Sequence, residues 1–171
     1  MGIGEGEGGE GDPYEADEHD AVGDGLTHAQ EDALGTDPND DDSDDDGLTD
    51  GAEAGPDGVV DPGTETNPLD PDTDDDGIQD GTEQGLVDPQ GDDTDPGVFV
   101  SDADGGNTTT DPLDPDSDDG GINDGDEDTN GNGQIDPGEA DPNAPGDDDA
   151  DGDGLTNDQE GILGTNPTDD D

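Results

Sequence analysis

Hydrophobic residues are few in this sequence, and most stand alone between polar ones. The longest apolar run is the three residues 98–100, and glycine or proline recurs every few positions. Such a pattern does not support a long amphipathic helix or an alternating strand. It predicts single helical turns over 29–34 and 157–163, and short strand pairing around 59–60 and 98–100. We therefore expect a fold with little regular secondary structure.

The unit 24–38 occurs again near the other end of the sequence. Shifted by 129 residues it aligns with 153–167, where ten of the fifteen positions are identical. Variants of the unit lie between these copies, and repeats of this kind usually stack into one extended architecture. Six twelve-residue loops result, numbered here along the chain as loop 1 (20–31), loop 2 (42–53), loop 3 (72–83), loop 4 (116–127), loop 5 (128–139) and loop 6 (149–160).

The rest of the chain connects or flanks these loops. Asp or Asn before Pro follows several loops, as in 36–38 and 110–112, and predicts an extended or turn connector. Residues 1–17 form a Gly/Glu-rich arm, and 86–109 is a longer insertion into the repeat region 18–171. The insertion contains the sequon 107–109, which makes Asn107 a candidate glycan acceptor.

The composition and charge of the chain exclude several classes of function. The net charge is −58 with no Lys or Arg, and Val, Ile, Leu and Phe make up 20 of the 171 residues. So little apolar surface cannot offset the entropy of ordering the chain, and the carboxylates repel one another. Nucleic acid and anionic membranes are excluded as partners, and no segment could span a bilayer. We expect no disulfide, no zinc site and no enzyme, because the chain lacks Cys, Lys and Arg and cannot build an apolar pocket.

The loops follow the pattern Asp-x-Asp-x-Asp-Gly-x-x-Asp-x-x-Glu, which suits calcium. Calcium takes six to eight oxygens at about 2.3–2.6 Å, from positions 1, 3, 5, 9 and 12 and the carbonyl of position 7, while glycine at position 6 allows the sharp turn. The predicted side-chain ligands are Asp20, Asp24, His28 and Glu31; Asp42, Asp44, Asp46, Asp50 and Glu53; Asp72, Asp74, Asp76, Asp80 and Glu83; Asp116, Asp118, Asp124 and Glu127; Asp128, Asn130, Asn132, Asp136 and Glu139; Asp149, Asp151, Asp153, Asn157 and Glu160. The predicted carbonyl ligands are those of Leu48, Ile78, Ile122, Gln134 and Leu155.

Two loops depart from the pattern. Loop 4 has Gly120 at position 5, and loop 1 has Val22 at position 3 and His28 at position 9. We expect these two sites to be weaker, or to be completed by neighbouring carboxylates. A solvated acidic tail that binds nothing is the alternative, but it does not explain why the loop glycines fall in register. We expect six or more calcium ions, since extra carboxylates such as Asp148 could hold further ions.

These units resemble thrombospondin type 3 repeats in their bacterial and archaeal form, with Asp-Gly-Leu-Thr-Asp-Gly-x-Glu and Gly-Thr-Asp-Pro. The resemblance covers about residues 18–171. It implies a chain wound around a row of calcium ions, in an extracellular and often adhesive setting. The absence of cysteine leaves calcium alone to hold the repeats together. Glutamate at position 12 is closer to an EF-hand or dockerin loop, but dockerins carry only two loops on real helices.

Three functions fit this sequence. The first is an extracellular rod, spacer or filament subunit that calcium orders. The second is an adhesive module of a cell-surface protein that presents the insertion to a partner. The third is a calcium buffer or mineral-binding polyanion with many independent sites. An extracellular setting is expected although residues 1–17 lack the pattern of a signal peptide.

The last residue, Asp171, lies at position 1 of an unfinished loop. The acidic N-terminal segment of a second copy could complete that loop through shared calcium. This spacing predicts head-to-tail polymerisation, a contact that gives filaments unless it closes.

Overall fold

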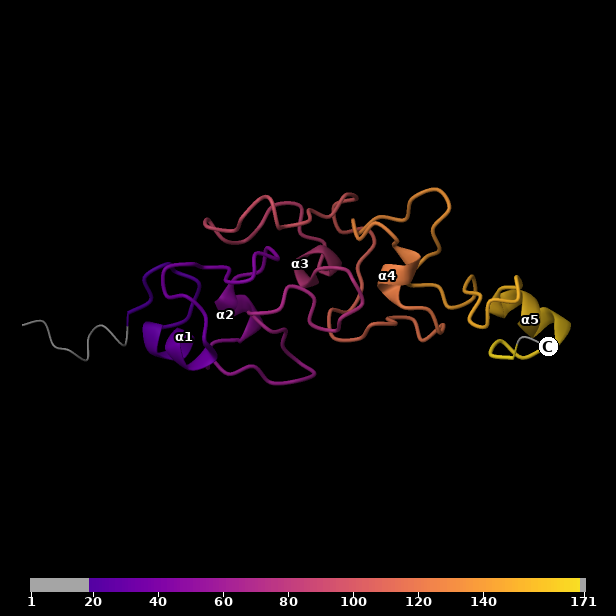
Figure 1. The fold of residues 1–171 in the computed structure, drawn as a ribbon, viewed down its shortest axis with the longest axis horizontal. Coiled ribbons are helices and arrows are strands. Elements are labelled where there is room, and N and C mark those ends of the chain that lie inside the picture. Colours follow the sequence, from indigo (N-terminus) through magenta and orange to yellow (C-terminus); the bar gives the residue numbers. More distant parts are fainter. Residues whose placement is uncertain (1–18, 170–171) are drawn as a thin grey trace, which may run out of the picture.

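The computed structural model of the chain describes residues 19–169. Five short helices follow one another along an elongated molecule (Figure 1): α1 (His28–Leu34), α2 (Asp50–Glu53), α3 (Asp80–Glu83), α4 (Asp124–Glu127) and α5 (Asn157–Leu163). The described part of the chain contains no β-strand, only the isolated bridges Pro62–Glu65 and Pro137–Glu139. The expectation of little regular helix or strand is confirmed.

The two longer helices, α1 and α5, agree with the sequence prediction, and each begins after a threonine and ends at a glycine. The N–H of Thr27 donates to Gln30 Oε1 (3.0 Å) before α1, and the Thr156 hydroxyl accepts from the Gln159 N–H (3.4 Å) before α5. Gly35 and Gly164 end these helices in the left-handed conformation, at φ 99° and 79°. None of the described helices is long and apolar enough to cross a membrane.

The four-residue helices α2, α3 and α4 were not predicted, because each contains a glycine and is too short to show periodicity. Each runs from position 9 to position 12 of its loop. The N–H of position 9 donates to the carbonyl just before the loop, from Asp50 to Asp41 (3.0 Å) and in the same way in loops 3 and 4. This hydrogen bond closes the loop, and the chain forms one helical turn over positions 9–12.

The predicted strand pairing is wrong. The N–H groups of Val98 and Phe99 donate to the Asp95 carbonyl (2.9 and 3.1 Å), which makes a turn. The N–H of Val100 donates to Gln79 Oε1 (2.7 Å), and that of Val59 to Asp57 Oδ1 (3.2 Å). N–H groups that already donate to a carbonyl within a turn or to a side-chain oxygen cannot donate to a neighbouring strand.

All six loops share one backbone arrangement. The N–H of the position 6 glycine donates to Oδ2 of the position 1 aspartate, over 2.7–3.3 Å. These glycines have φ between 69° and 109°, which a residue with a side chain rarely adopts. In every loop but loop 4, the N–H of position 7 donates to Oδ1 of position 5, over 2.7–2.9 Å. The glycine spacing therefore corresponds to a recurring turn.

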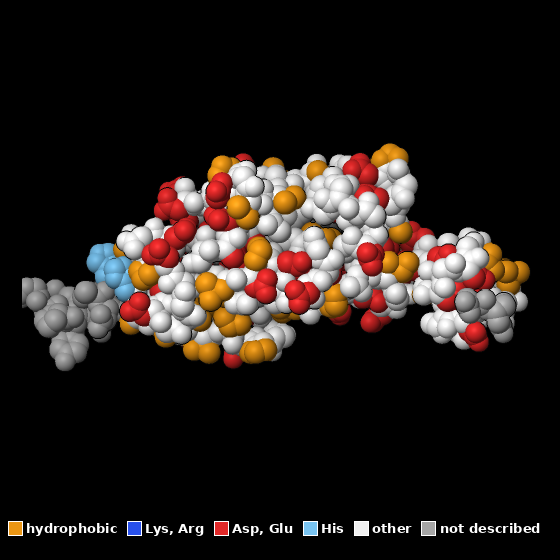
Figure 2. Space-filling view, in the orientation of Figure 1, with side chains coloured by type: hydrophobic (Ala, Val, Ile, Leu, Met, Phe, Trp, Pro, Cys, Tyr) orange, Lys and Arg blue, Asp and Glu red, His pale blue; other side chains and the backbone are white. Residues whose placement is uncertain are grey.

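The interior of the described molecule is acidic rather than apolar. Its buried hydrophobic side chains are Leu26, Leu48, Ala54 and Ile78, whereas fourteen Asp and Glu residues are buried. Figure 2 shows further acidic side chains over the surface, among scattered hydrophobic ones. Leu163 is 65 % exposed, on a helix at the end of the described row.

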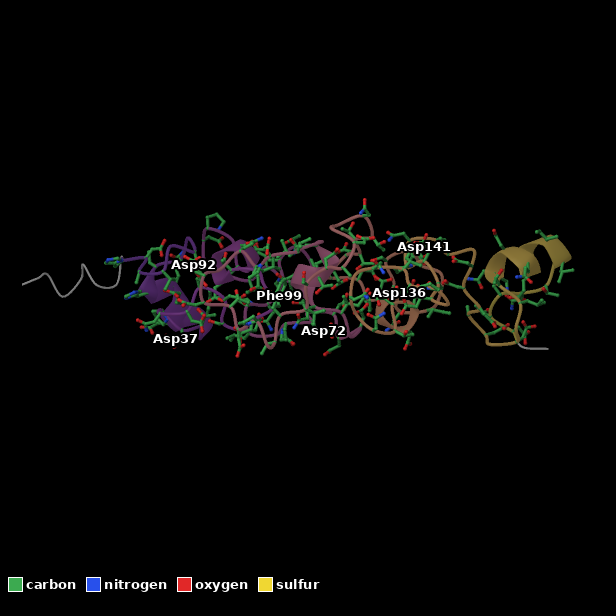
Figure 3. All side chains as sticks on the ribbon, turned by 90° about the horizontal axis from the view of Figure 1, so that it is seen from above. Asp37, Asp72, Asp92, Phe99, Asp136 and Asp141 are labelled. Carbon is green, nitrogen blue, oxygen red and sulfur yellow. The ribbon has the colours of Figure 1, made fainter. Side chains whose placement is uncertain are left out.

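The insertion 86–109 folds back along the repeats and lies beside α2 and α3 (Figure 1). The carboxylate of Asp41 accepts the N–H groups of Asp92 (2.9 Å) and Asp93 (3.2 Å), and Phe99 lies against Gly47. Figure 3 shows Asp92 and Phe99 one after the other along the long axis of the molecule. Asn107 is exposed, and its Nδ2 donates to the Asp104 carbonyl.

Candidate metal centres

Carboxylates gather inside single loops. In loop 2 they come from Asp42, Asp44 and Asp46, and in loop 3 from the equivalent 72, 74 and 76 positions. Within each group one oxygen per residue lies within 4.8 Å of the others. Two oxygens bound to one calcium ion can lie up to about 5 Å apart, so each group has the spacing of a common ion. The sequence predicted these two sets.

A second kind of cluster joins one loop to the next. Each combines position 5 and position 12 of one loop with position 9 of the following loop, again with oxygens within 4.8 Å of one another. Three such clusters are Asp24, Glu31 and Asp50; Asp46, Glu53 and Asp80; and Asp76, Glu83 and Asp124. Because position 5 also belongs to the cluster inside its loop, Asp46 and Asp76 connect both kinds of site.

Glycine at position 10 brings the loops this close. The N–H of Gly81 donates to Asp46 Oδ2 (2.9 Å), and that of Gly125 to Asp76 Oδ2 (3.0 Å). A Cβ atom at Gly51, Gly81 or Gly125 would collide with the backbone carbonyl of Asp24, Asp46 or Asp76, respectively. The absence of a side chain at position 10 therefore allows successive loops to dock.

The position 12 glutamates are the buried members of these clusters. Glu31, Glu53 and Glu83 are at most 2 % exposed, and both oxygens of Glu31 and Glu53 lack a hydrogen-bond partner. Burial, together with neighbouring aspartates, raises the pKa of Glu53 to about 10 and that of Glu83 to about 9. Burial also raises the pKa of Asp44 to about 8. Buried carboxylates without donors need a proton or a cation.

The placement of position 9 differs from the simple loop pattern. Sequence reasoning grouped Asp50, Asp80 and Asp124 with their own loops, whereas the structure places each beside the preceding loop. Their own loops still hold them, since the Ser43 hydroxyl donates to Asp50 (2.8 Å) and the Thr73 hydroxyl to Asp80 (2.6 Å).

His28, the position 9 residue of loop 1, stacks on His19 with ring centroids 5.9 Å apart. The third carboxylate of the loop 1 cluster is that of Asp50. Asp20 accepts the Gly23 and Gly25 N–H groups and so shapes the turn of loop 1.

Loop 5 closes through its own side chains. The amides of Asn130, Asn132 and Gln134 donate to the carboxylate of Asp136 (2.8–3.3 Å). Glu139 accepts from the Thr129 hydroxyl, the Asn130 amide and the Asp136 N–H, and these bonds lower its pKa. Asp128 is buried with one oxygen lacking a partner.

Loops 4 and 6 hold the remaining predicted ligands. In loop 4, Asp116 shapes the turn and Glu127 is buried without a donor. In loop 6, Asp149 and Asp151 each have a buried oxygen without a partner, and Asp153 accepts the Leu155 N–H. Glu160 is 1 % exposed with one such oxygen, and burial raises its pKa.

Sequence reasoning missed the hydroxyl groups that support the acidic clusters. Thr110, in the connector after the insertion, donates to Glu83 (2.8 Å), and Thr94 of the insertion donates to Asp42. Ser43, Thr73 and Ser117 at position 2 accept the N–H of the connector residue six positions earlier, over 2.8–3.1 Å. The recurrence of Ser or Thr at position 2 of loops 2, 3 and 4 was the available signal.

Comparisons with known proteins add no family to this description. The chain matches no protein-family model, no curated protein and no solved structure. The functional argument therefore depends on the geometry of the described residues.

Proposed function

We propose that this chain is a calcium-binding structural protein, a tandem repeat array wound around a row of calcium ions. The observation that carries the proposal is the set of clusters between loops, in which buried glutamates meet aspartates of two loops and two of these glutamates, Glu31 and Glu53, have no hydrogen-bond donor. The carbonyls of Leu48, Ile78, Ile122, Gln134 and Leu155 are proposed as additional ligands.

The charge of the chain favours metal ions over protons as the neutralising partners of the buried carboxylates. The chain has no Lys or Arg to neutralise its buried carboxylates. Keeping one glutamate of ordinary pKa 4.5 protonated at pH 7 costs about 3 kcal/mol. Repeated over the acidic interior, this cost exceeds the whole stability of a typical domain, about 5–15 kcal/mol. A divalent cation neutralises several carboxylates at once and so supports the fold at neutral pH.

The donor set favours calcium among divalent cations. The three clusters named above, between loops of the described chain, offer carboxylate oxygen atoms only, and the sequence contains no cysteine. Calcium accepts many carboxylates in a flexible geometry, whereas magnesium keeps most of its water and demands a strict octahedron.

Ligands shared between loops favour a structural role over a calcium buffer. An ion bound by Asp46, Glu53 and Asp80 would join loops 2 and 3, so binding at one site would help to order the next. A buffer would instead have independent sites. Ions of this kind would make the elongated row a semi-rigid spacer.

The proposed setting is extracellular, because extracellular calcium modules bind at about 10⁻⁴–10⁻³ M. The resemblance to thrombospondin type 3 repeats supports this setting and an adhesive or matrix role. Head-to-tail polymerisation remains a prediction, since Asp171 and the N-terminal arm lie outside the described residues.

An NMR titration tests the proposal. In chelator at pH 7 we expect the amide proton shifts of the full chain to be poorly dispersed. Millimolar calcium should disperse them in one cooperative transition, while equal magnesium should not.

Substitution of one ligand between loops gives the matched comparison. Glu53→Gln should raise the calcium concentration at the midpoint, whereas Glu65→Gln, outside every loop, should not. The proposal is rejected if calcium leaves the spectrum unchanged, and a buffer is favoured if residues titrate independently.

A further inference from the structure

Loop 4 has the turn of the other loops but lacks one carboxylate. The N–H of Gly120 donates to Asp116 Oδ1 (3.0 Å) and Asp118 Oδ1 (2.8 Å), as position 5 of loop 3 does. In loops 2 and 3 the position 5 side chain joins the loop to the next one. At Gly120 no side chain is available for this contact.

The carboxylate of Asp148 lies in the place of that missing side chain. A Cβ atom built on Gly120 would overlap Asp148 Oδ2 and would lie 2.8 Å from Asp118 Oδ1. Asp148 directly precedes loop 6, so its carboxylate approaches loop 4 from another part of the chain. Loop 5 lies between the two in sequence.

Two of the carboxylates around this point are buried and lack donors. Asp148 is 1 % exposed and Glu127 is 2 % exposed, and neither carboxylate has a hydrogen-bond partner. Burial and the neighbouring Asp148 carboxyl group raise the pKa of Glu127. One oxygen of Asp118 is also buried without a partner. Three ionised groups so placed would repel one another unless a cation lies among them.

Asn157, at position 9 of loop 6, points to the same junction. Its Nδ2 donates to the Gly120 carbonyl (2.8 Å), and its Oδ1 is buried without a partner. At the junctions of loops 1 to 4, position 9 of the later loop supplies the third carboxylate of the cluster. Asn157 Oδ1 would supply the corresponding oxygen here.

We propose that Asp118, Glu127, Asp148 and Asn157 form a calcium site in which Asp148 replaces the absent position 5 ligand of loop 4. The site joins loop 4 to loop 6 and bypasses loop 5. At the junctions of loops 1 to 4, a glycine at position 10 contacts the preceding loop. Loop 6 has Asp158 at position 10 instead, and its N–H donates to the Gly146 carbonyl. In our proposal the shared ion takes the place of that glycine contact. This inference rests on the proposed calcium binding of the whole chain.

Moving the ligand back into loop 4 provides the test. Asp148→Ala removes the carboxylate, and Gly120→Asp with Asp148→Ala restores one in the usual position. Gly120 lacks the positive φ of Gly121 (105°), so its backbone accepts a side chain once Asp148 is shortened and the Asp118 carboxylate shifts slightly away. The matched control is Asp147→Ala, which changes the charge equally at an exposed neighbour.

Two readouts on the full chain are compared: calcium ions bound per chain, by equilibrium dialysis at fixed free calcium, and amide hydrogen exchange in loop 6. Asp148→Ala should lose one ion and the protection of loop 6, while Asp147→Ala should match the wild type. The double variant should regain both, even if Asp148→Ala loosens more of the chain.

The proposed site is wrong if Asp148→Ala keeps the full number of ions, or if the double variant regains neither the ion nor the protection. A wild-type chain that binds no calcium would instead refute the general calcium proposal. The two failures are therefore distinguishable.

Discussion

At the residue scale, Glu53 illustrates the chemistry of the interior. Its side chain is 2 % exposed, and Asp44, Asp46 and Thr66 influence its ionisation. No basic side chain can pair with it, because the sequence contains no Lys or Arg. Its folded state therefore needs a bound cation near neutral pH or a proton at acidic pH.

This requirement predicts an inverse pH response without metal. The pKa values of Glu53 and Glu83 rise on folding from 4.5 to about 10 and about 9. A raised folded-state pKa gives stability that is fully present below the unfolded value and is lost as pH rises towards the folded value. In chelator, the chain should be more ordered at pH 5 than at pH 8, by NMR dispersion.

The variant Glu53→Gln with Glu83→Gln provides the control for this response. Amides do not titrate, so the difference between pH 5 and pH 8 should shrink. Equal disorder of the chelated wild type at both pH values would show that these carboxylates do not control folding.

At the scale of the element, the four-residue helices act as docking points. Each places a position 9 aspartate and a position 10 glycine against the preceding loop. The helices are too short to be stable alone, so the loop contacts must hold them.

Gly81→Ala tests this docking. Its Cβ would collide with the Asp46 carbonyl, and overpacking of this kind costs about 1–3 kcal/mol. With calcium present, amide hydrogen exchange should show that protection is lost where loops 2 and 3 dock. Gly161→Ala, also in a helix but with open space around it, should leave protection unchanged or improved. Equal effects of the two substitutions would contradict docking through position 10.

Contacts inside a loop could be predicted from the sequence, whereas contacts between loops could not. The in-register glycines and aspartates predicted the loop turns and the clusters inside loops 2 and 3, because those contacts are local. The partner of Asp80 in loop 2 could not be predicted, since it depends on how loops stack. The same holds for Asp148, whose contact spans 28 positions to Gly120. Strand pairing at 98–100 failed because a turn at Asp95 and the side chain of Gln79 satisfy the N–H groups of that segment.

At the scale of the molecule, the helices form a row in which contacts recur between neighbours (Figure 1). Few hydrophobic side chains are buried along this row, while fourteen acidic ones are. In our account, cations take the place of a hydrophobic core, so their removal should release the whole chain rather than one segment.

Small-angle X-ray scattering with chelator and then with millimolar calcium tests this central claim most directly. Without calcium, the radius of gyration should be about 44 Å, the value for an unfolded chain of this length. With calcium at unchanged mass, it should fall to the value calculated from the elongated structure. An unchanged profile would contradict a calcium-ordered fold.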